Sequence, residues 1–174
     1  MREPAVWNDL VGLKTTPGRL SLEGVVPLIH SFDTVGPLCR DVADAALMLA
    51  ALENGKAADL RGASLRGRRF AVLQSVALDD LAAEPAAAFD HAVRRLEAAG
   101  ATVVPLEFPE IREALDLTAV LYCGEAYGIW REVIEANPDL MFAEILERFR
   151  AGRLFSAPDF AAGWLRLTQI RKSY

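Results

Sequence analysis

The stretch FAVLQSVALDDLAAEPAAAFDHAVRRLEAAGATVV, residues 70–104, decides the fold class. It begins with the short apolar run 70–73 and ends with the β-branched run 102–104, and both have the composition of buried strands. Between them Pro85 opens a helix that Gly100 closes. One face of this helix carries Phe89, Ala92, Val93 and Leu96. A strand, a helix and a strand at this spacing predict a right-handed crossover with parallel strands, so the sequence predicts an α/β fold with both strands buried.

The segments before and after this βαβ unit are expected to differ in secondary structure. Residues 1–40 are expected to be loop-rich with short strands, because prolines and glycines interrupt any helix. A helix should follow Asp41, which suits an N-cap, and should end at Asn54-Gly55. We therefore expect one partial domain with three regions: 1–40 as loops, 41–108 as a helix and the βαβ unit, and 109–174 as helices.

The helical region after Pro109 carries its own boundary signals. Asn137-Pro138 should separate two helices, and Ser156 followed by Asp159 resembles a capping box that opens the last one. Aromatic side chains spread among leucines and isoleucines are expected to be core: Tyr127, Trp130, Phe142, Phe149, Phe160 and Trp164. Helical patterning continues to Tyr174 without a C-cap, which favours a truncated domain.

Composition excludes several classes of protein. The net charge of −5 argues against a nucleic-acid partner, and the one basic cluster, residues 61–69, is interpreted as a solvated loop. Charges interrupt every apolar stretch well before the roughly 18 residues that span a bilayer, and no signal peptide is visible, so no membrane partner is expected. The two cysteines, Cys39 and Cys123, have neither disulfide-framework nor zinc spacing, which favours the cytoplasm.

No internally complete active site can be assembled from these residues. The two histidines, His30 and His91, occur without an HExxH motif, so we expect no metal and no cofactor. Residues 62–66 lack the second glycine of a serine nucleophile elbow, and no lysine has a serine three residues before it. Cys123 lies in an apolar helical pattern and is interpreted as an inert thiol. No residue is assigned a catalytic role.

Successive blocks near the start of the chain carry a resemblance. They are Arg2-Glu3-Pro4-Ala5, then VGLKTTPGRLS at residues 11–21, GVVPL at 24–28, and SFDTVGPLCRDVADAA at 31–46. In order and spacing they resemble the amidase signature family. The rest of the chain resembles that family more loosely, through the strands and the helix of residues 70–104 and the helices after Pro109. The resemblance implies part of a mixed twisted β-sheet flanked by helices.

The family's chemistry uses a serine nucleophile, a second serine on a cis peptide and a neutral lysine, with backbone amides for the oxyanion. The resemblance places the nucleophile just before Met1 and the other two residues further upstream, so none of the three maps onto this sequence. Arg2 would lie beside the nucleophile, where it shapes the substrate pocket or, as we prefer, anchors the loop. Lys14 belongs to the block after the nucleophile and is interpreted as structural, while Asp33 and Arg40 could pair to hold their loop.

The resemblance implies hydrolysis of a carboxamide C–N bond in a small-molecule substrate by a full-length parent, with this chain inactive alone. Two alternatives remain open. One is a non-catalytic remnant or assembly partner, which could complement a separately encoded N-terminal fragment. The other is the amidotransferase subunit that supplies ammonia to misacylated transfer RNA; it ranks lower because residues 15–17 and 22–24 look more like stand-alone amidases. Missing sheet and helix neighbours should leave apolar surface exposed and favour self-association.

Overall fold

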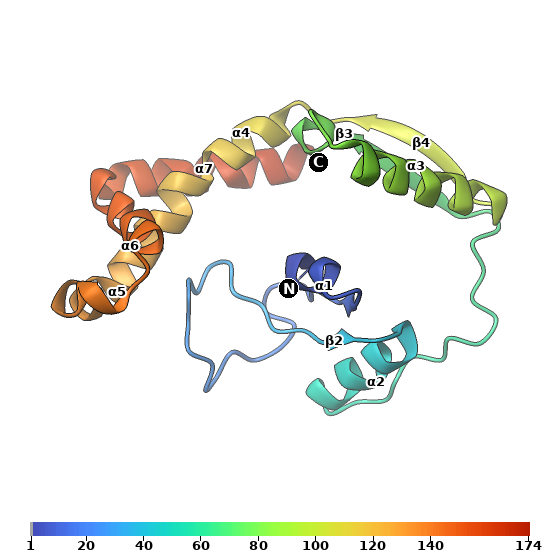
Figure 1. Ribbon diagram of the computed structural model, residues 1–174, viewed down its shortest axis with the longest axis horizontal. Coiled ribbons are helices and arrows are strands. Elements are labelled where there is room, and N and C mark those ends of the chain that lie inside the picture. The colour runs from blue at the N-terminus through green and yellow to red at the C-terminus, as the bar shows by residue number, and fades with distance from the viewer. Residues whose placement is uncertain (1) are drawn as a thin grey trace. The chain divides into compact units, whose positions relative to one another are not determined.

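The computed structural model describes residues 2–174, with side chains from residue 3 onward, as two compact units divided between Ala63 and Ser64. Figure 1 shows the elements of the first unit in blue to cyan and those of the second in green to red. Each unit has its own secondary structure, and we describe them separately. The three regions expected from the sequence remain a prediction.

The first unit consists of two helices and one antiparallel strand pair. Helix α1 spans Arg2–Trp7, strand β1 Val11–Gly12, strand β2 Leu38–Cys39 and helix α2 Val42–Leu52. Val11 pairs with Cys39, and Gly12 pairs with Leu38. The long connection between the two strands has no regular structure, as expected for the loop-rich start of the chain. Helix α1 contradicts the expectation that no helix forms before residue 40; Pro4 lies in its first turn, where a missing N–H costs no helical hydrogen bond. The side chains that pack this unit are Ala5, Leu20, Ile29, Ala45 and Ala50.

Helix α2 has the boundaries that the sequence predicts. The side chain of Asp41 caps it by accepting a hydrogen bond from the Asp44 amide at 2.8 Å. Asn54 has a φ of 51°, in the left-handed region, and the Gly55 amide donates to the Ala50 carbonyl at 2.8 Å. The N-cap and the Asn-Gly stop are both confirmed.

The second unit begins with the βαβ motif. Strand β3 spans Arg69–Gln74, helix α3 Ala83–Ala98 and strand β4 Thr102–Glu107. The strands are parallel, with Arg69 opposite Thr102, so the predicted parallel pairing is confirmed. Helix α3 begins two residues before Pro85, and Gly100 ends it with a φ of 89°.

The prediction that both strands are buried is wrong for this chain. No residue of β3 or β4 is fully buried, and none of α3 is either. A parallel strand pair buries its residues when helices cover both faces. Among the described residues, the sheet has two strands, and α3 is its main helical neighbour.

The rest of the second unit is helical. The regular helices are α4 (Glu110–Asp116), α5 (Gly124–Ala136), α6 (Ala143–Arg150) and α7 (Ala157–Ser173). A π-helical turn, η2 (Ala119–Cys123), precedes α5, and short 3₁₀ turns η1 (Val76–Leu78), η3 (Pro138–Leu140) and η4 (Ala151–Leu154) connect other elements. Asn137-Pro138 separates α5 from α6, and Ser156 and Asp159 form a capping box on α7, so both sequence signals are confirmed.

The aromatic residues expected in the core are less buried than predicted. Phe142 has 72% of its surface exposed. The other five are half-buried: Tyr127, Trp130, Phe149, Phe160 and Trp164. The buried residues of this unit are instead mainly aliphatic: Phe108, Leu121, Ala126, Ile134, Leu146, Leu167 and Ile170.

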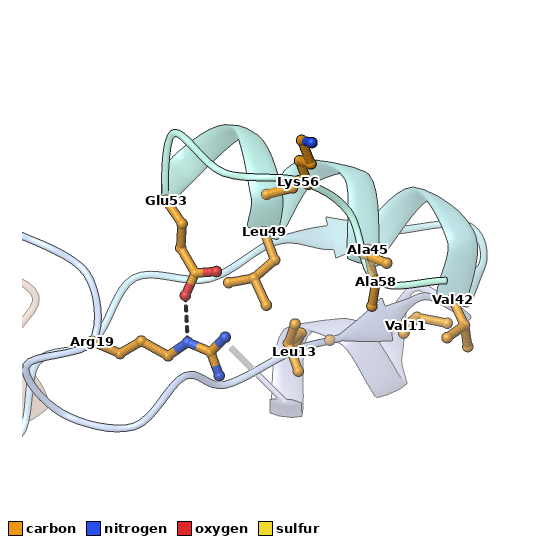
Figure 2. Close-up of a pocket in the computed structure, with 12 residues that line it drawn as sticks. Val11, Leu13, Arg19, Val42, Ala45, Leu49, Glu53, Lys56 and Ala58 are labelled. Carbon is orange, nitrogen blue, oxygen red and sulfur yellow. Dashed lines mark hydrogen bonds and ion pairs between the residues drawn. The ribbon is translucent and has the colours of Figure 1, made fainter. Parts of the chain in front are cut away.

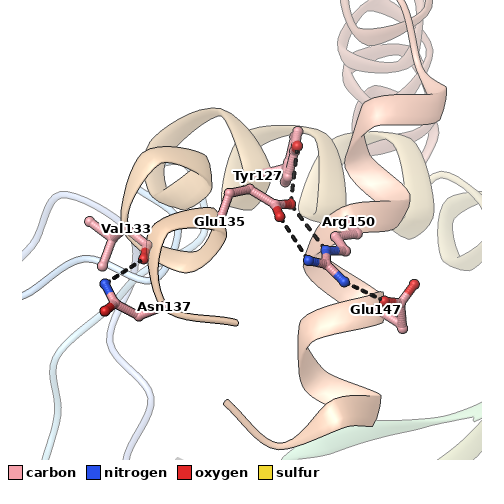
Figure 3. A network of polar contacts seen from close by, with 6 residues as sticks. All are labelled: Tyr127, Val133, Glu135, Asn137, Glu147 and Arg150. Carbon is pink, nitrogen blue, oxygen red and sulfur yellow. Dashed lines mark hydrogen bonds and ion pairs between the residues drawn. The ribbon is translucent and has the colours of Figure 1, made fainter. Parts of the chain in front are cut away.

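Polar contacts join the helices of the second unit. The Arg150 guanidinium of α6 donates to both carboxylate oxygens of Glu135 on α5, at 3.0 and 2.7 Å, and to Glu147 at 3.0 Å (Figure 3). The Tyr127 hydroxyl also donates to Glu135, at 3.3 Å. Arg166 of α7 forms a second forked pair with Glu113 of α4, with both hydrogen bonds at 2.5 Å. These forks fix the relative placement of neighbouring helices.

The accessible area of the chain exceeds the area expected for two separate compact units. Its accessible area is 12,714 Å² for a mass of 19.0 kDa. Two separate compact units of these lengths should expose about 10,000 Å² together. Among the exposed residues are large apolar ones such as Trp7, Leu140 and Leu154. Within residues 2–174, none of the helices combines the length and the apolar composition needed to cross a bilayer.

Candidate functional site

Helix α1 carries the residue that the sequence singled out for substrate binding. The side chain of Arg2 lies outside the described residues, so its proposed role stays a prediction. Ala5 packs inward with 2% of its surface exposed, whereas Val6 and Trp7 are 79% and 82% exposed. The helix ends when the Leu10 amide donates to the Ala5 carbonyl at 2.9 Å, which directs the chain into β1.

Two glycine turns shape the loop that follows β1. The Arg19 amide donates to the Thr16 carbonyl at 3.0 Å, and the intervening Pro17 and Gly18, with a φ of 79° at the glycine, match a type II turn. Gly24, with a φ of 77°, occupies the same position in a turn closed by Val25 and Leu22. A side chain at either glycine would strain the backbone, because L-residues rarely adopt these angles. This requirement explains both glycines in the quoted blocks.

Polar side chains hold the rest of this loop. The buried Thr15 hydroxyl donates to the Val35 carbonyl at 2.6 Å. The Asp33 carboxylate accepts from the Leu28 and Ile29 amides at 2.8 and 3.1 Å. Asp33 therefore holds the loop through backbone amides, and none of the ion pairs found among the described residues joins it to Arg40. Lys14 is exposed and donates to the neighbouring Thr15 carbonyl at 2.6 Å, which agrees with a structural role.

A cavity of about 300 Å³ lies between this loop and α2. Figure 2 shows apolar side chains of α2 facing those of the β1 segment across it. Charged groups stand at one end, where Arg19 pairs with Glu53, and Lys56 also contributes to the lining. The apolar lining consists of Val11, Gly12, Leu13, Val42, Ala45, Ala46, Leu49, Ala50 and Ala58.

The Arg19–Glu53 pair sets the electrostatics of this cavity. The hydrogen bond from the guanidinium lowers the pKa of Glu53 below its ordinary value, and the carboxylate raises the pKa of Arg19 in turn. Both groups therefore stay charged around neutral pH, and the pair ties the glycine turn at Arg19 to the end of α2. The sequence did not reveal this cavity, because 34 residues separate the two charges and no motif connects them.

The remaining candidate groups do not converge on a reactive site. His30 and His91 are both exposed, in different units. Cys123 is half-buried in the π-helical turn, and its burial raises the pKa of the thiol, which agrees with an inert cysteine. Over the part of the chain that the structure describes, no group of three or more His, Cys, Asp or Glu residues could hold a metal ion.

The geometry supports binding and scaffolding and does not by itself supply nucleophilic chemistry. The cavity offers an apolar wall and a charged end, which suit contact with an apolar group that also carries polar atoms. Amide hydrolysis needs a nucleophile and a base within hydrogen-bonding reach of each other. The Lys14 ammonium donates to the Thr15 carbonyl, a contact that does not activate a serine.

Comparison with known proteins connects these features to a family. The family model described as Amidase matches residues 1–169. A 2-amino-5-chloromuconic acid deaminase of Comamonas testosteroni is 43% identical over 119 residues, which cover 67% of this chain and 26% of that protein. One of the subunits of the glutamyl-tRNA(Gln) amidotransferase of Sinorhizobium fredii is 31% identical over 203 aligned positions, covering 98% of this chain and 41% of that protein.

A solved structure shows the same fold. A crystal structure of an amidase superimposes with a TM-score of 0.85 and 26% identity, covering 98% of this chain and 38% of that one. This chain therefore spans only about a quarter to two-fifths of the length of the relatives it matches. The expected α/β fold class is confirmed by this superposition and by the parallel βαβ unit.

Proposed function

This chain belongs to the amidase family, and from that membership we propose that its protein hydrolyses the C–N bond of a small-molecule carboxamide. The family match across residues 1–169 is the observation that supports this proposal most directly. Residues 1–174 act as a scaffold in this proposal, and the nucleophile, the bridging serine and the base come from outside them. The isolated chain should then be inactive.

The structure of the first unit suits a scaffolding role. The glycine turns at Gly18 and Gly24, the Asp33 loop and the Arg19–Glu53 pair hold a long loop in one conformation. A lysine acts as a base near neutral pH only in a dry site, because burial lowers the pKa of an ammonium group. A rigid loop with an apolar cavity beside it helps to exclude water from such a site.

Arg2 has a specific place in the proposal. The family pattern puts it next to the nucleophile, at the start of α1, and we assign it the role of anchoring the loop rather than contacting substrate. In an active assembly, Arg2→Ala should then lower thermal stability and kcat with little change in KM. A large rise in KM at unchanged stability would show instead that Arg2 binds substrate.

An amidotransferase function remains the second candidate. It is supported by the amidotransferase relatives, whose alignments cover up to 98% of this chain, more than the deaminase covers. A protein of that class would need partner subunits and a transfer RNA. The net charge of −5 and the absence of an aromatic-lined basic stripe favour a small-molecule substrate without nucleic acid. We place the protein in the cytoplasm, because both cysteines are free thiols.

A chimera tests the hydrolase proposal. The stretch of the Comamonas testosteroni deaminase that aligns with this chain is replaced by the corresponding residues of this chain, and ammonia release is measured with the deaminase's own substrate and a panel of carboxamides. We expect release that disappears when the serine just upstream of Arg2 in the chimera is changed to alanine. A folded chimera that releases no ammonia from any of these compounds would contradict the proposal. Release that requires the other amidotransferase components to be added would favour the second candidate.

A further inference from the structure

The ion pair at one end of the cavity beside α2 leaves several hydrogen-bonding groups unused. Arg19 donates through Nε to one carboxylate oxygen of Glu53. Among the described residues, this is the only hydrogen bond that either side chain makes. The two terminal nitrogens of Arg19 therefore keep their donors, and the second oxygen of Glu53 keeps its capacity to accept.

These unused groups face the apolar part of the cavity. Figure 2 shows the terminal nitrogens of Arg19 and the second oxygen of Glu53 on the side of the pair that faces Leu13 and Leu49. Lys56 also lines the cavity, but its ammonium points away from these two leucines. The polar end of the cavity thus presents a donor beside an acceptor.

The charges at this polar end select among the polar groups that a ligand could bring. A carboxylate would meet the carboxylate of Glu53, and an ammonium would meet the guanidinium of Arg19, so each would face a like charge. A neutral group that carries an acceptor beside a donor satisfies both residues at once. A primary carboxamide is such a group, because its oxygen accepts and its NH₂ donates.

The rest of the lining determines the size and character of the ligand. On the α2 side the wall contains Ala45, Ala46 and Ala50, whose short side chains leave room, and Val11 and Leu13 form part of the opposite wall. The volume of about 300 Å³ lies at the lower end of the range for small-molecule sites, about 300–1,000 Å³. A single ring or a short aliphatic chain therefore suits this wall.

We propose that this cavity binds a small neutral compound made of an apolar ring or short chain and a primary carboxamide, with Arg19 donating to the carbonyl oxygen and Glu53 accepting from the NH₂ group. Every lining residue belongs to the first unit. The inference goes beyond the proposed function, because it concerns binding by residues 1–174 themselves and needs no nucleophile.

A comparison of three probes that share one ring tests the ligand class. Binding of 4-fluorobenzamide, 4-fluorobenzoate and 4-fluorobenzylamine to residues 1–174 is measured at pH 7 by ¹⁹F NMR titration. The Kd of the neutral carboxamide should be at least about fivefold lower than that of either charged probe, because each charged probe leaves one group of the ion pair without a suitable partner. Tighter binding of either charged probe would overturn the assigned ligand class.

Two variants of the ion pair test whether these residues contact the ligand. Glu53→Gln leaves the charge of Arg19 uncompensated, so the ratio of the two dissociation constants should shift at least about fivefold toward 4-fluorobenzoate. Arg19→Gln leaves the charge of Glu53 uncompensated, so the preference should shift by a similar factor toward 4-fluorobenzylamine. A purely structural ion pair would lower the affinity for all three probes and leave their order unchanged, which would contradict the proposal.

A matched pair of leucine variants tests the location of the site. Ala46 lines the cavity, whereas Ala43 lies exposed on the same helix and outside the lining. Ala46→Leu should weaken binding of 4-fluorobenzamide at least about tenfold by filling the cavity, and Ala43→Leu less than about twofold. Circular dichroism confirms that both variants are folded, and if Ala46→Leu is not, the opposite shifts of the two ion-pair variants decide.

The remaining outcomes also decide. If 4-fluorobenzamide does not bind the wild-type chain, the proposal is wrong. If the two leucine variants are folded and weaken binding equally, or not at all, the ligand binds elsewhere and the assigned site is wrong. None of these measurements depends on ammonia release. A chain that binds 4-fluorobenzamide as expected, while the chimera releases no ammonia, would therefore contradict only the proposed function.

Discussion

Replacement of Gly152 by alanine should be one of the most destabilising substitutions in this chain that add a single methyl group. Gly152 is buried in η4, and a Cβ placed there would lie 2.0 Å from the carbonyl oxygen of Cys123 and 2.6 Å from its carbonyl carbon. It would also lie 2.7 Å from the Cβ of Tyr127. Two of these three atoms belong to the backbone of the π-helical turn, so no side-chain rotation relieves the overlap.

The expected cost follows from that geometry. Adding a methylene group to a packed site typically costs about 1–3 kcal/mol. The cost at Gly152 should lie at or above the upper end of this range, because the added group would overlap backbone atoms. We expect Gly152→Ala to lower the free energy of unfolding of the second unit by about 3 kcal/mol or more. For a unit of about 100 residues this corresponds to a fall in Tm of roughly 10–20 °C.

A second glycine provides the control. Gly128 lies in α5, and a Cβ there would meet no atom within 4 Å. Gly128→Ala should therefore stabilise the helix by roughly 0.5–1 kcal/mol. Both variants are compared with the wild type by urea unfolding, followed by circular dichroism at low protein concentration. A Gly152→Ala variant as stable as the wild type would refute the close approach of η4 to Cys123.

Three further predictions concern caps, pH and association. Asp41→Ala should destabilise α2 by about 1 kcal/mol in urea unfolding, whereas Asp41→Asn, which keeps an acceptor at the N-cap, should lose much less; equal losses would contradict the cap. Hydrogen bonds from Arg166 lower the pKa of Glu113 below its ordinary value of 4.5. The stabilisation from this pair is thus complete above that pH and is lost as the pH falls through the lowered folded-state value. The difference in urea midpoint between wild type and Glu113→Gln should therefore shrink as the pH falls below 4.5. An unchanged difference would show that the pair contributes nothing. In sedimentation velocity, the isolated chain should form species larger than a monomer as its concentration rises, and a monomer with one cooperative melt would contradict the exposed apolar surface.

Local signals predicted much of the secondary structure. The Asp41 cap, the Asn54-Gly55 stop and the Ser156–Asp159 capping box each depend on atoms within a few residues of one another, so the sequence contains all the information they need. The βαβ unit was predictable for a similar reason. Its handedness and its parallel pairing follow from general stereochemistry once a strand, a helix and a strand are recognised.

Burial and long-range pairing were not predictable in the same way. Strand β3 has the composition of a buried strand, yet burial depends on which elements pack against it, and a single sequence does not reveal these. Phe142 illustrates the same difficulty, since an aromatic residue in a helical pattern is 72% exposed here. The partners of Asp33 were missed because backbone amides leave no trace in a residue pattern. The Arg19–Glu53 pair joins residues whose proximity depends on the turn at Gly18.

The contacts within this chain contribute little of the stability that its helices and strands need, which favours folding together with further parts of the domain. Many of its long-range polar contacts, such as Arg19–Glu53 and Arg166–Glu113, join partly exposed side chains, and pairs of this kind contribute little net stability in water. Helix α3 spans sixteen residues without one that is fully buried. Burial of apolar area is the dominant favourable contribution to folding, at roughly 25 cal/mol per Å². A helix and a strand pair that bury so little must gain most of their stability from additional contacts.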